Sequence, residues 1–242
     1  MTAALRVAEL GLVPYAEAHA LQRRLAERVI RREIDSDVLL LLEHERTVTL
    51  GRGTKAASLP LAAEELGRRG VTVAEVERGG DVTWHGPGQL VGYPILDLGR
   101  HTQDLHWYLR AVEEALIRGL DRLGIAGGRN PGYTGVWTGG RKIASIGIHV
   151  RQWVTTHGFA LNVQNRLDDF GLIVPCGIQG VEMTSVAREL GEEGSPALWR
   201  RTVDAVTAGL AEVFQLRPQP ATLAALEPEG TGAAPAAFHG KP

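Results

Sequence analysis

Cysteine is nearly absent from this sequence: Cys176 is the single thiol among 242 residues. An internal disulfide is therefore excluded, and such low cysteine usage is typical of proteins in a reducing compartment. Residues 1–13 lack a basic stretch followed by an apolar one, so we expect no secretory signal. These features predict a cytoplasmic protein.

Long apolar runs and a strong charge of one sign are also missing. The longest purely apolar run, residues 38–42, is far too short to span a bilayer. A formal net charge of −2 does not favour a nucleic-acid-binding surface. The eight histidines are scattered, without His-x-His, Cys-x-x-Cys or a helical pair four residues apart. We therefore expect no membrane, nucleic-acid or metal partner.

What is present suits one α/β (α+β) domain. Hydrophobic residues make up 44% of the chain and charged residues 22%, which is ordinary for a globular protein. Apolar residues recur at helical spacing after Pro14. Periodicity predicts further helices over residues 60–69, 104–123 and 197–214, and strands over residues 38–42, 47–50, 71–76, 90–98, 132–137, 142–150 and 157–163. This order favours a mixed sheet flanked by helices.

Two features set limits on this arrangement. Pro94 removes a backbone donor from the strand over residues 90–98, so we expect that strand at a sheet edge. Beyond Arg217 the composition shifts to Pro, Ala and Gly, and no periodicity survives. The sequence therefore predicts a single domain over residues 1–216 and a disordered tail over residues 217–242.

A glycine-rich segment runs from Arg78 to Gln89 and contains Trp84 and His85. Its four glycines allow the backbone to approach a ligand closely. The segment does not match a P-loop, because no Gly-Lys-Ser/Thr follows the glycines. Ordinary turn chemistry explains these glycines equally well.

A second segment, residues 139–150, places Lys142 at the end of an apolar strand face. Partial desolvation there favours a neutral amine that can act as a base. A lysine whose ammonium group simply reaches water at the strand end is the more common situation, and without other information it is favoured.

The third segment is Pro175-Cys176-Gly177-Ile178. A lone cysteine is more often a small buried apolar residue than a nucleophile. Its setting between Pro and Gly nevertheless leaves room for a substrate carbonyl near backbone N–H groups that could stabilise an oxyanion. Thiolates are also both strong nucleophiles and good leaving groups in thioester exchange.

Together with His157-Gly158-Phe159-Ala160-Leu161-Asn162-Val163, these segments resemble the lipoyl(octanoyl) transferases of lipoate biosynthesis. The resemblance covers residues 10–214 and implies a fold like that of the biotin and lipoate protein ligases. Small departures are Trp84 in place of Phe or Tyr, Phe159 in place of Leu, and Ser145 where Ala is frequent.

The resemblance implies that Cys176 carries an acyl thioester and that Lys142 assists formation of its thiolate. It also implies a substrate site made of Arg78, Gly79, Gly80, Asp81, Val82, Thr83, Trp84, His85, Ser145, Ile146, Gly147, Gly158, Phe159 and Ala160.

The implied reaction moves an octanoyl group from acyl carrier protein to a lysine of lipoyl domains, in 2-oxoacid dehydrogenase complexes and the glycine cleavage H protein. Neither ATP nor a metal is expected as cofactor, because a thioester keeps its acyl group activated. The alternatives are an ATP-dependent lipoate or biotin ligase and a non-catalytic fatty-acyl binding module. Arginines at positions 23, 24, 28, 31 and 32 form either a docking surface for an acidic carrier or a solvated helix face.

Overall fold

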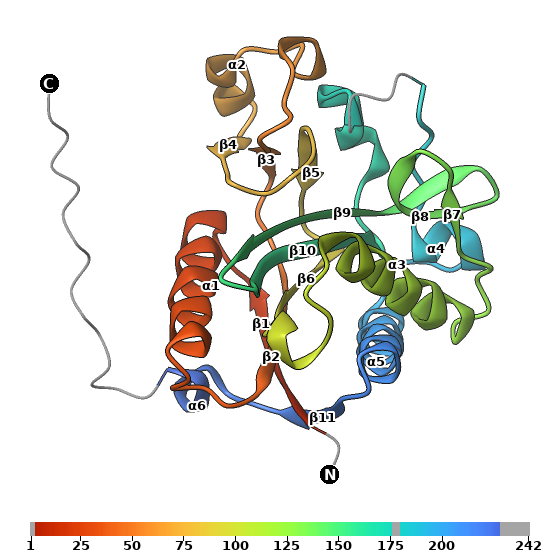
Figure 1. The fold of residues 1–242 in the computed structure, drawn as a ribbon. Helices are drawn as coiled ribbons and strands as arrows, with labels where there is room; N and C mark the ends of the chain where they lie inside the picture. Colours follow the sequence, from red (N-terminus) through yellow and green to blue (C-terminus); the bar gives the residue numbers. More distant parts are fainter. Residues whose placement is uncertain (1–2, 176–179, 228–242) are drawn as a thin grey trace, which may run out of the picture.

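The computed structural model describes residues 3–175 and 180–227, and Figure 1 colours this chain from red to blue along the sequence. Its larger sheet is formed, in chain order, by β1 (Ala4–Leu12), β2 (Asp37–Glu43), β6 (Gln89–Ile95), β7 (Gly128–Asn130), β8 (Tyr133–Thr138), β9 (Arg141–Arg151), β10 (Val154–Asn162) and β11 (Arg217–Pro220). Their order across the sheet is β11-β1-β2-β6-β10-β9-β8-β7. The β11–β1 and β1–β2 pairs are parallel and the other pairs antiparallel, so the sheet is mixed.

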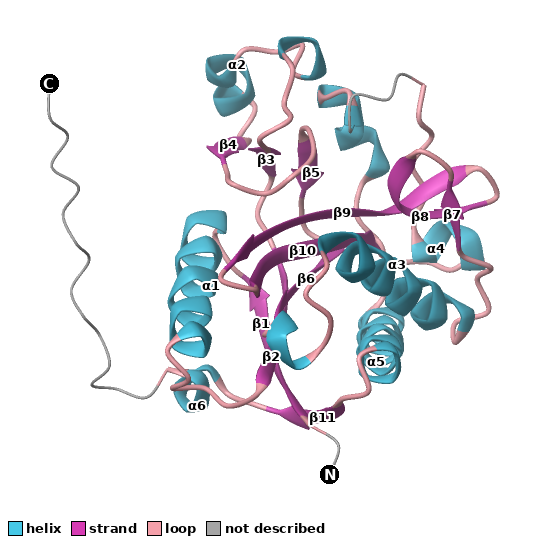
Figure 2. Ribbon diagram, viewed as in Figure 1, coloured by secondary structure: helices cyan, strands magenta, loops and turns pink. Residues whose placement is uncertain are grey.

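A smaller sheet of order β4-β3-β5 comprises β3 (Thr47–Leu50), β4 (Thr72–Glu75) and β5 (Thr83–His85). The helices are α1 (Tyr15–Ile30), α2 (Ala63–Arg68), α3 (Leu105–Asp121), α4 (Val186–Leu190), α5 (Pro196–Val213) and α6 (Leu223–Leu226), with 3-10 turns at Ala56–Ser58, Leu98–Arg100 and Leu167–Leu172. In Figure 2 the cyan helices α1 on one side and α3 with α5 on the other flank the magenta large sheet. None of the helices in the described part is long and apolar enough to cross a membrane.

The two faces of β2 explain this layering. Val38, Leu40 and Leu42 pack with α1 in one buried cluster, whereas Leu39 and Leu41 belong to the cluster that contains α3 and α5. Successive strand residues point to opposite faces, so an apolar run without alternation needs helices on both sides. The predicted helices and strands, and the mixed sheet flanked by helices, are confirmed.

The prediction that Pro94 marks an edge strand is wrong. Strand β6 lies between β2 and β10, inside the sheet. Its ladder with β10 runs from Gln89 to Gly92 and ends before Pro94, so the missing N–H interrupts no ladder bond there. The Pro94 carbonyl accepts a hydrogen bond from Thr155 Oγ1 at 2.7 Å, and the His157 N–H on β10 donates to Gln22 Oε1 at 2.7 Å. Side chains therefore replace the ladder beside the proline.

The predicted start of the disordered tail is also wrong. Residues 217–220 form β11, which pairs in parallel with Ala4–Val7 of β1. The following helix α6 buries Leu226 completely in the cluster beneath α1. Two arginines of α1 hold this segment: Arg24 forms a bidentate ion pair with Glu227, and Arg28 donates to the Leu226 carbonyl. The ordered chain therefore extends at least to residue 227, and the rest of the predicted tail lies outside the described residues.

The small sheet places the glycine-rich segment over the large one. The Gly79 N–H donates to the Ile148 carbonyl of β9 at 2.8 Å, which ties the segment to the centre of that strand. Strand β5 then pairs with β3, and the chain returns to the large sheet as β6. The segment consequently closes over β9 and β10.

Candidate active site

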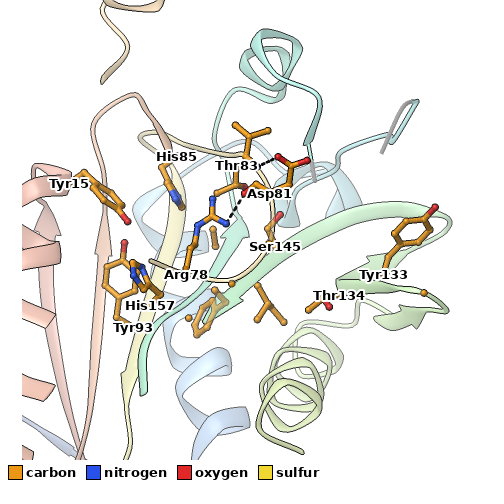
Figure 3. Close-up of a pocket in the computed structure, with 18 residues that line it drawn as sticks. Tyr15, Arg78, Asp81, Thr83, His85, Tyr93, Tyr133, Thr134, Ser145 and His157 are labelled. Atoms are coloured by element: carbon orange, nitrogen blue, oxygen red, sulfur yellow. Dashed lines mark hydrogen bonds between the residues drawn. The ribbon is translucent and has the colours of Figure 1, made fainter. Parts of the chain in front are cut away.

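A cavity of about 240 Å³ lies where the glycine-rich segment crosses β9 and β10, as Figure 3 shows. Of the fourteen residues predicted to bind substrate, twelve line it: Arg78, Gly80, Asp81, Val82, Thr83, His85, Ser145, Ile146, Gly147, Gly158, Phe159 and Ala160. Separate segments of the sequence thus meet at one site. Their contact with a substrate stays a prediction.

Gly79 and Trp84 lie elsewhere. Alternation along β5 directs the neighbouring Thr83 and His85 toward the cavity, so Trp84 points to the opposite face. Its indole is buried in the core of the small sheet and lies under the Arg46 guanidinium, 5.4 Å from the ring centre. We assign Trp84 to that core.

The guanidinium of Arg78 organises the glycine-rich segment. It is nearly buried and donates to the carbonyl and hydroxyl oxygens of Thr49, both at 2.8 Å. It also donates to the Asp81 carbonyl at 2.8 Å and to the Gly79 carbonyl at 3.1 Å. Charged donors strengthen such hydrogen bonds. The side chain thereby fixes the turn that forms one wall of the cavity.

Glycine is required where this wall meets the strands. A β-carbon at Gly147 would lie 2.9 Å from Arg78 Cδ and 3.1 Å from the Gly79 carbonyl oxygen. At Gly158, φ is +157° and a β-carbon would lie 2.3 Å from the Gly92 carbonyl oxygen. Both glycines permit close backbone approach between the glycine-rich segment and the strands of the large sheet.

A neutral histidine supports the far end of the cavity. His44 Nδ1 donates to the Val13 carbonyl at 2.8 Å, so Nε2 accepts the hydrogen bond from the Tyr93 hydroxyl at 2.7 Å. Burial lowers the pKa of His44 to about 4, which keeps the ring uncharged at neutral pH. The buried His44 ring thus orients the Tyr93 hydroxyl, and the sequence alone does not predict this contact.

His85 is neutral for the same reason. Its Nδ1 donates to Gln89 Oε1 at 2.9 Å, because the amide nitrogen of Gln89 is itself donating to Trp84 O and Asn162 Oδ1. Burial holds the pKa of His85 well below its usual range. Its Nε2 accepts a long hydrogen bond from the Thr49 hydroxyl at 3.5 Å, and the lowered pKa makes the ring a poor general base at neutral pH.

Lys142 is the second residue of β9 and is completely buried. Its Nζ lies over the Trp137 ring, 5.4 Å from the ring centre. Its backbone pairs with the chain that follows Gly180: the N–H donates to Glu182 O at 2.8 Å, and the carbonyl accepts from Thr184 N at 2.9 Å. The expectation of a lysine reaching water at a strand end therefore fails. Cys176 lies outside the described residues.

Six lining residues were not predicted from the sequence: Tyr15, Tyr93, Gly132, Tyr133, Thr134 and His157. In Figure 3, Tyr15, Tyr93 and His157 gather at one end of the cavity and Tyr133 and Thr134 at the other. His157 opens the strand segment that carries Gly158 and was the one detectable signal. The tyrosines belong to no motif, because only the fold brings them to the site.

Comparison with known proteins decides the family. A model of the lipoyl protein ligase A/B catalytic domain matches residues 14–214. The chain belongs to the lipoyl protein ligase A/B catalytic domain family. This family membership confirms the resemblance that the sequence motifs suggested.

Curated relatives in this family carry the name octanoyltransferase. One from Geobacter sulfurreducens is 49% identical over 206 residues, covering 85% of this chain and 84% of the relative. Another from Gloeobacter violaceus is 55% identical over 172 residues (70% and 74%), and one from Koribacter versatilis is 44% identical over 238 residues (93% and 94%).

Solved structures of lipoate protein ligases share the fold at low sequence identity. Lipoate-protein ligase A bound with ATP has a TM-score of 0.71 at 17% identity, covering 92% of this chain and 90% of that one. A bipartite lipoate protein ligase from Thermoplasma acidophilum has a TM-score of 0.70 at 18% identity, with coverage of 91% and 88%. The fold predicted from the resemblance is thus confirmed.

Proposed function

We propose that this protein transfers an octanoyl group to a lysine side chain of lipoyl domains, as the first step of protein lipoylation. The observation that carries the proposal is the set of octanoyltransferases that are 44–55% identical over most of the chain. The cavity supports it: a volume of about 240 Å³ is small for a drug-sized ligand and suits a medium-length acyl chain.

In the proposed first half-reaction, Lys142 accepts the proton of the Cys176 thiol. The thiolate attacks the thioester carbonyl carbon of octanoyl acyl carrier protein and forms a C–S bond. The tetrahedral oxyanion collapses, the donor's C–S bond breaks, and the phosphopantetheine thiolate leaves with the proton from Lys142. The product is an octanoyl thioester on Cys176.

In the second half-reaction the amine of the acceptor lysine attacks this thioester. Its surplus proton passes to Lys142, and the C–S bond to Cys176 breaks as the amide forms. The cysteine thiolate then recovers the proton, so the enzyme ends as it began. The first transfer replaces one thioester by another, and the second replaces a thioester by an amide. Neither step requires ATP, because a thioester is already an activated acyl group.

The described residues support this assignment of the base. Lys142 is buried, and its strand pairs directly with the segment that follows Gly180, four residues after Cys176. Pro175, which precedes the cysteine, and Met183, which bridges to Lys142, line one surface hollow.

The proposed donor is acyl carrier protein. The proposed acceptors are the lipoyl domains of 2-oxoacid dehydrogenase complexes and the glycine cleavage H protein. The T. acidophilum ligase was solved in a study of that ligase and its E2 lipoyl domain, which is a precedent for such an acceptor within the fold. With one cysteine in the chain, we place the reaction in the cytoplasm.

The rival function is ATP-dependent ligation, because a structure with this fold binds ATP. Incubation with octanoyl acyl carrier protein, without ATP, followed by intact-mass measurement separates the two. A transferase gains one octanoyl mass and loses it when a lipoyl domain is added, and Cys176→Ser gains none. A ligase gains no mass under these conditions but modifies the lipoyl domain once ATP and free octanoate are supplied, and that result would refute the proposal.

A further inference from the structure

Three side chains from separate elements converge beside the cavity: His19 of α1, Glu77 just before the glycine-rich segment, and His157 of β10. His19 Nε2 lies 3.1 and 3.0 Å from the two carboxylate oxygens of Glu77, and His157 Nε2 lies 3.8 Å from Oε2. One donor atom from each of the three lies within 4.8 Å of the others. Sequence spacing gave no sign of this cluster, because the residues are far apart in the chain.

The second observation is the state of the His157 ring. The residue is 2% exposed, and its Nε2 has no hydrogen-bond partner among the described residues. A buried ring nitrogen without a partner is costly, and native structures usually provide one. The nitrogen is directed at a carboxylate and a second imidazole, so a ligand at this point would satisfy it.

We propose that His19, Glu77 and His157 bind a divalent transition-metal ion of the Zn²⁺ class. Two imidazoles and one carboxylate are ligands that Zn²⁺ accepts, with donor-to-metal distances of about 2.0–2.2 Å. Neighbouring ligand atoms in a tetrahedral site then lie about 3.4 Å apart. The Glu77 carboxylate lies 3.0 Å from His19 Nε2 and 3.8 Å from His157 Nε2, on either side of that value. Three protein ligands leave a fourth position for water.

The charges around the site set the strength of binding. An imidazole binds a metal ion in its neutral form and a carboxylate in its ionised form, so two histidines and one glutamate suit a divalent ion. Arg23, Arg24 and Arg151 line the adjoining groove and weaken the attraction for a cation. We therefore expect moderate rather than tight binding.

The position of this site gives it a structural effect. Glu77 is bonded directly to Arg78, and His157 to Gly158, two residues that line the proposed acyl cavity. A bound ion would link α1, the glycine-rich segment and β10. Because binding to the folded state alone raises stability, the ion should raise the melting temperature. This inference does not depend on the proposed acyl transfer.

The test uses the full chain with Cys176→Ser, which removes the competing thiol. After chelator treatment and dialysis, thermal unfolding is followed at defined free Zn²⁺ concentrations. At about 100 times the dissociation constant we expect the melting temperature to rise by roughly 5–10 °C. Equilibrium dialysis should give one ion per chain, and Co²⁺ should show the visible absorption bands of four-coordinate cobalt.

Removal of single ligands shows where the ion binds. In the Cys176→Ser background, His19→Ala and Glu77→Gln should each abolish the Zn²⁺-induced rise and the cobalt bands. Exposed His106 lies on α3 outside the cluster, so His106→Ala should retain both. A parent protein that shows neither rise nor bands, or variants that respond as the parent does, would overturn the proposal.

Discussion

The α-carbon of Gly135 lies against the side chain of Lys142. A β-carbon at this glycine would be 2.9 Å from Lys142 Cε, 3.4 Å from Nζ and 2.6 Å from the Ala144 carbonyl oxygen. The φ of Gly135 is +135°, and its N–H donates to Glu113 Oε1 at 3.1 Å. Because Gly135 of β8 has no side chain, the Lys142 side chain of β9 can lie directly against the β8 backbone.

Gly135→Ala should displace the Lys142 amine and strain the backbone. Because misplacement of a catalytic group by about 1 Å can cost roughly 100-fold in rate, we expect a 10- to 100-fold loss of acyl transfer. Gly128→Ala on β7 is the matched control, since a β-carbon there meets nothing within 4 Å. Equal turnover in the two variants would show that the glycine does not position Lys142.

Lys142→Ala should lower turnover by about 10²–10⁴-fold, the usual range for a lost general acid–base. Lys142→Arg should preserve part of the thiol reactivity but little turnover, because a guanidinium keeps its charge and cannot accept the proton. Thiol alkylation rates against pH report the first property and acyl transfer rates the second. Exposed Lys55 offers the control, Lys55→Ala. Unaltered rates in Lys142→Ala would remove it from the mechanism.

Phe159 should limit acyl chain length. Its ring covers Gly92 on the adjacent strand, where a β-carbon would lie 2.1 Å from Cζ, and it lines the cavity. In Phe159→Leu a smaller side chain replaces the phenyl ring, so the cavity becomes deeper. The enzyme should then prefer a longer acyl chain. The preference is measured by offering the enzyme a mixture of acyl carrier protein thioesters of different chain lengths and identifying the bound acyl group by intact mass. Phe170→Leu, in the core of the small sheet, should leave the preference unchanged.

Acid should destabilise the fold through His44. Its pKa is about 4 in the folded protein and about 6.5 when unfolded, so the unfolded chain binds the proton more readily. Stability is therefore intact above about pH 6.5 and is lost as pH falls toward 4, by roughly 3 kcal/mol in total. Urea unfolding at pH 7, 6, 5 and 4 should show a shallower loss in His44→Gln. Exposed His106→Gln should follow the wild type.

Truncation should show that the segment formed by β11 and α6 contributes to the stability of the fold. Ending the chain at Leu216 removes β11 and α6 with the fully buried Leu226, whereas ending it at Glu227 keeps them. Loss of a buried leucine alone costs about 2–5 kcal/mol, so the shorter chain should melt at least about 5 °C lower than the longer one. Identical melting temperatures would show that residues 217–227 do not stabilise the domain, and the predicted domain boundary at residue 216 would stand.

The parts of the site that could be predicted lie in runs of consecutive residues that form a recognisable motif. The glycine-rich segment was recognisable because close backbone approach needs glycines at particular positions along the chain. The role of the Pro-Cys-Gly segment stays a prediction, because Cys176 lies outside the described residues. His19, Glu77 and Tyr93 carry no such signature, since each is ordinary in its own element. The packing of α1 against β6 and β10 brings His19 and Tyr93 to one region, and Glu77 reaches His19 from the segment between β4 and β5.

The two errors in the fold have a common cause. Pro94 and the proline-containing segment 217–220 were judged by propensity, which describes the backbone alone. In the structure, contacts with distant residues hold both segments in place. Thr155 Oγ1 donates to the Pro94 carbonyl, and Arg24 and Arg28 of α1 bind Glu227 and the Leu226 carbonyl at the end of α6. Such long-range partners are invisible in a local window of sequence.

The parallel pairing of β11 with β1 has a consequence for synthesis of the chain. Ala4 emerges early from the ribosome, whereas its partner Arg217 is among the last described residues to be made. Until then the outer edge of β1 is an open template for other strands. Closing a ladder between such distant segments is slow, and exposed edges invite association while it is incomplete. A chaperone that covers β1 during translation should therefore raise the yield of folded protein.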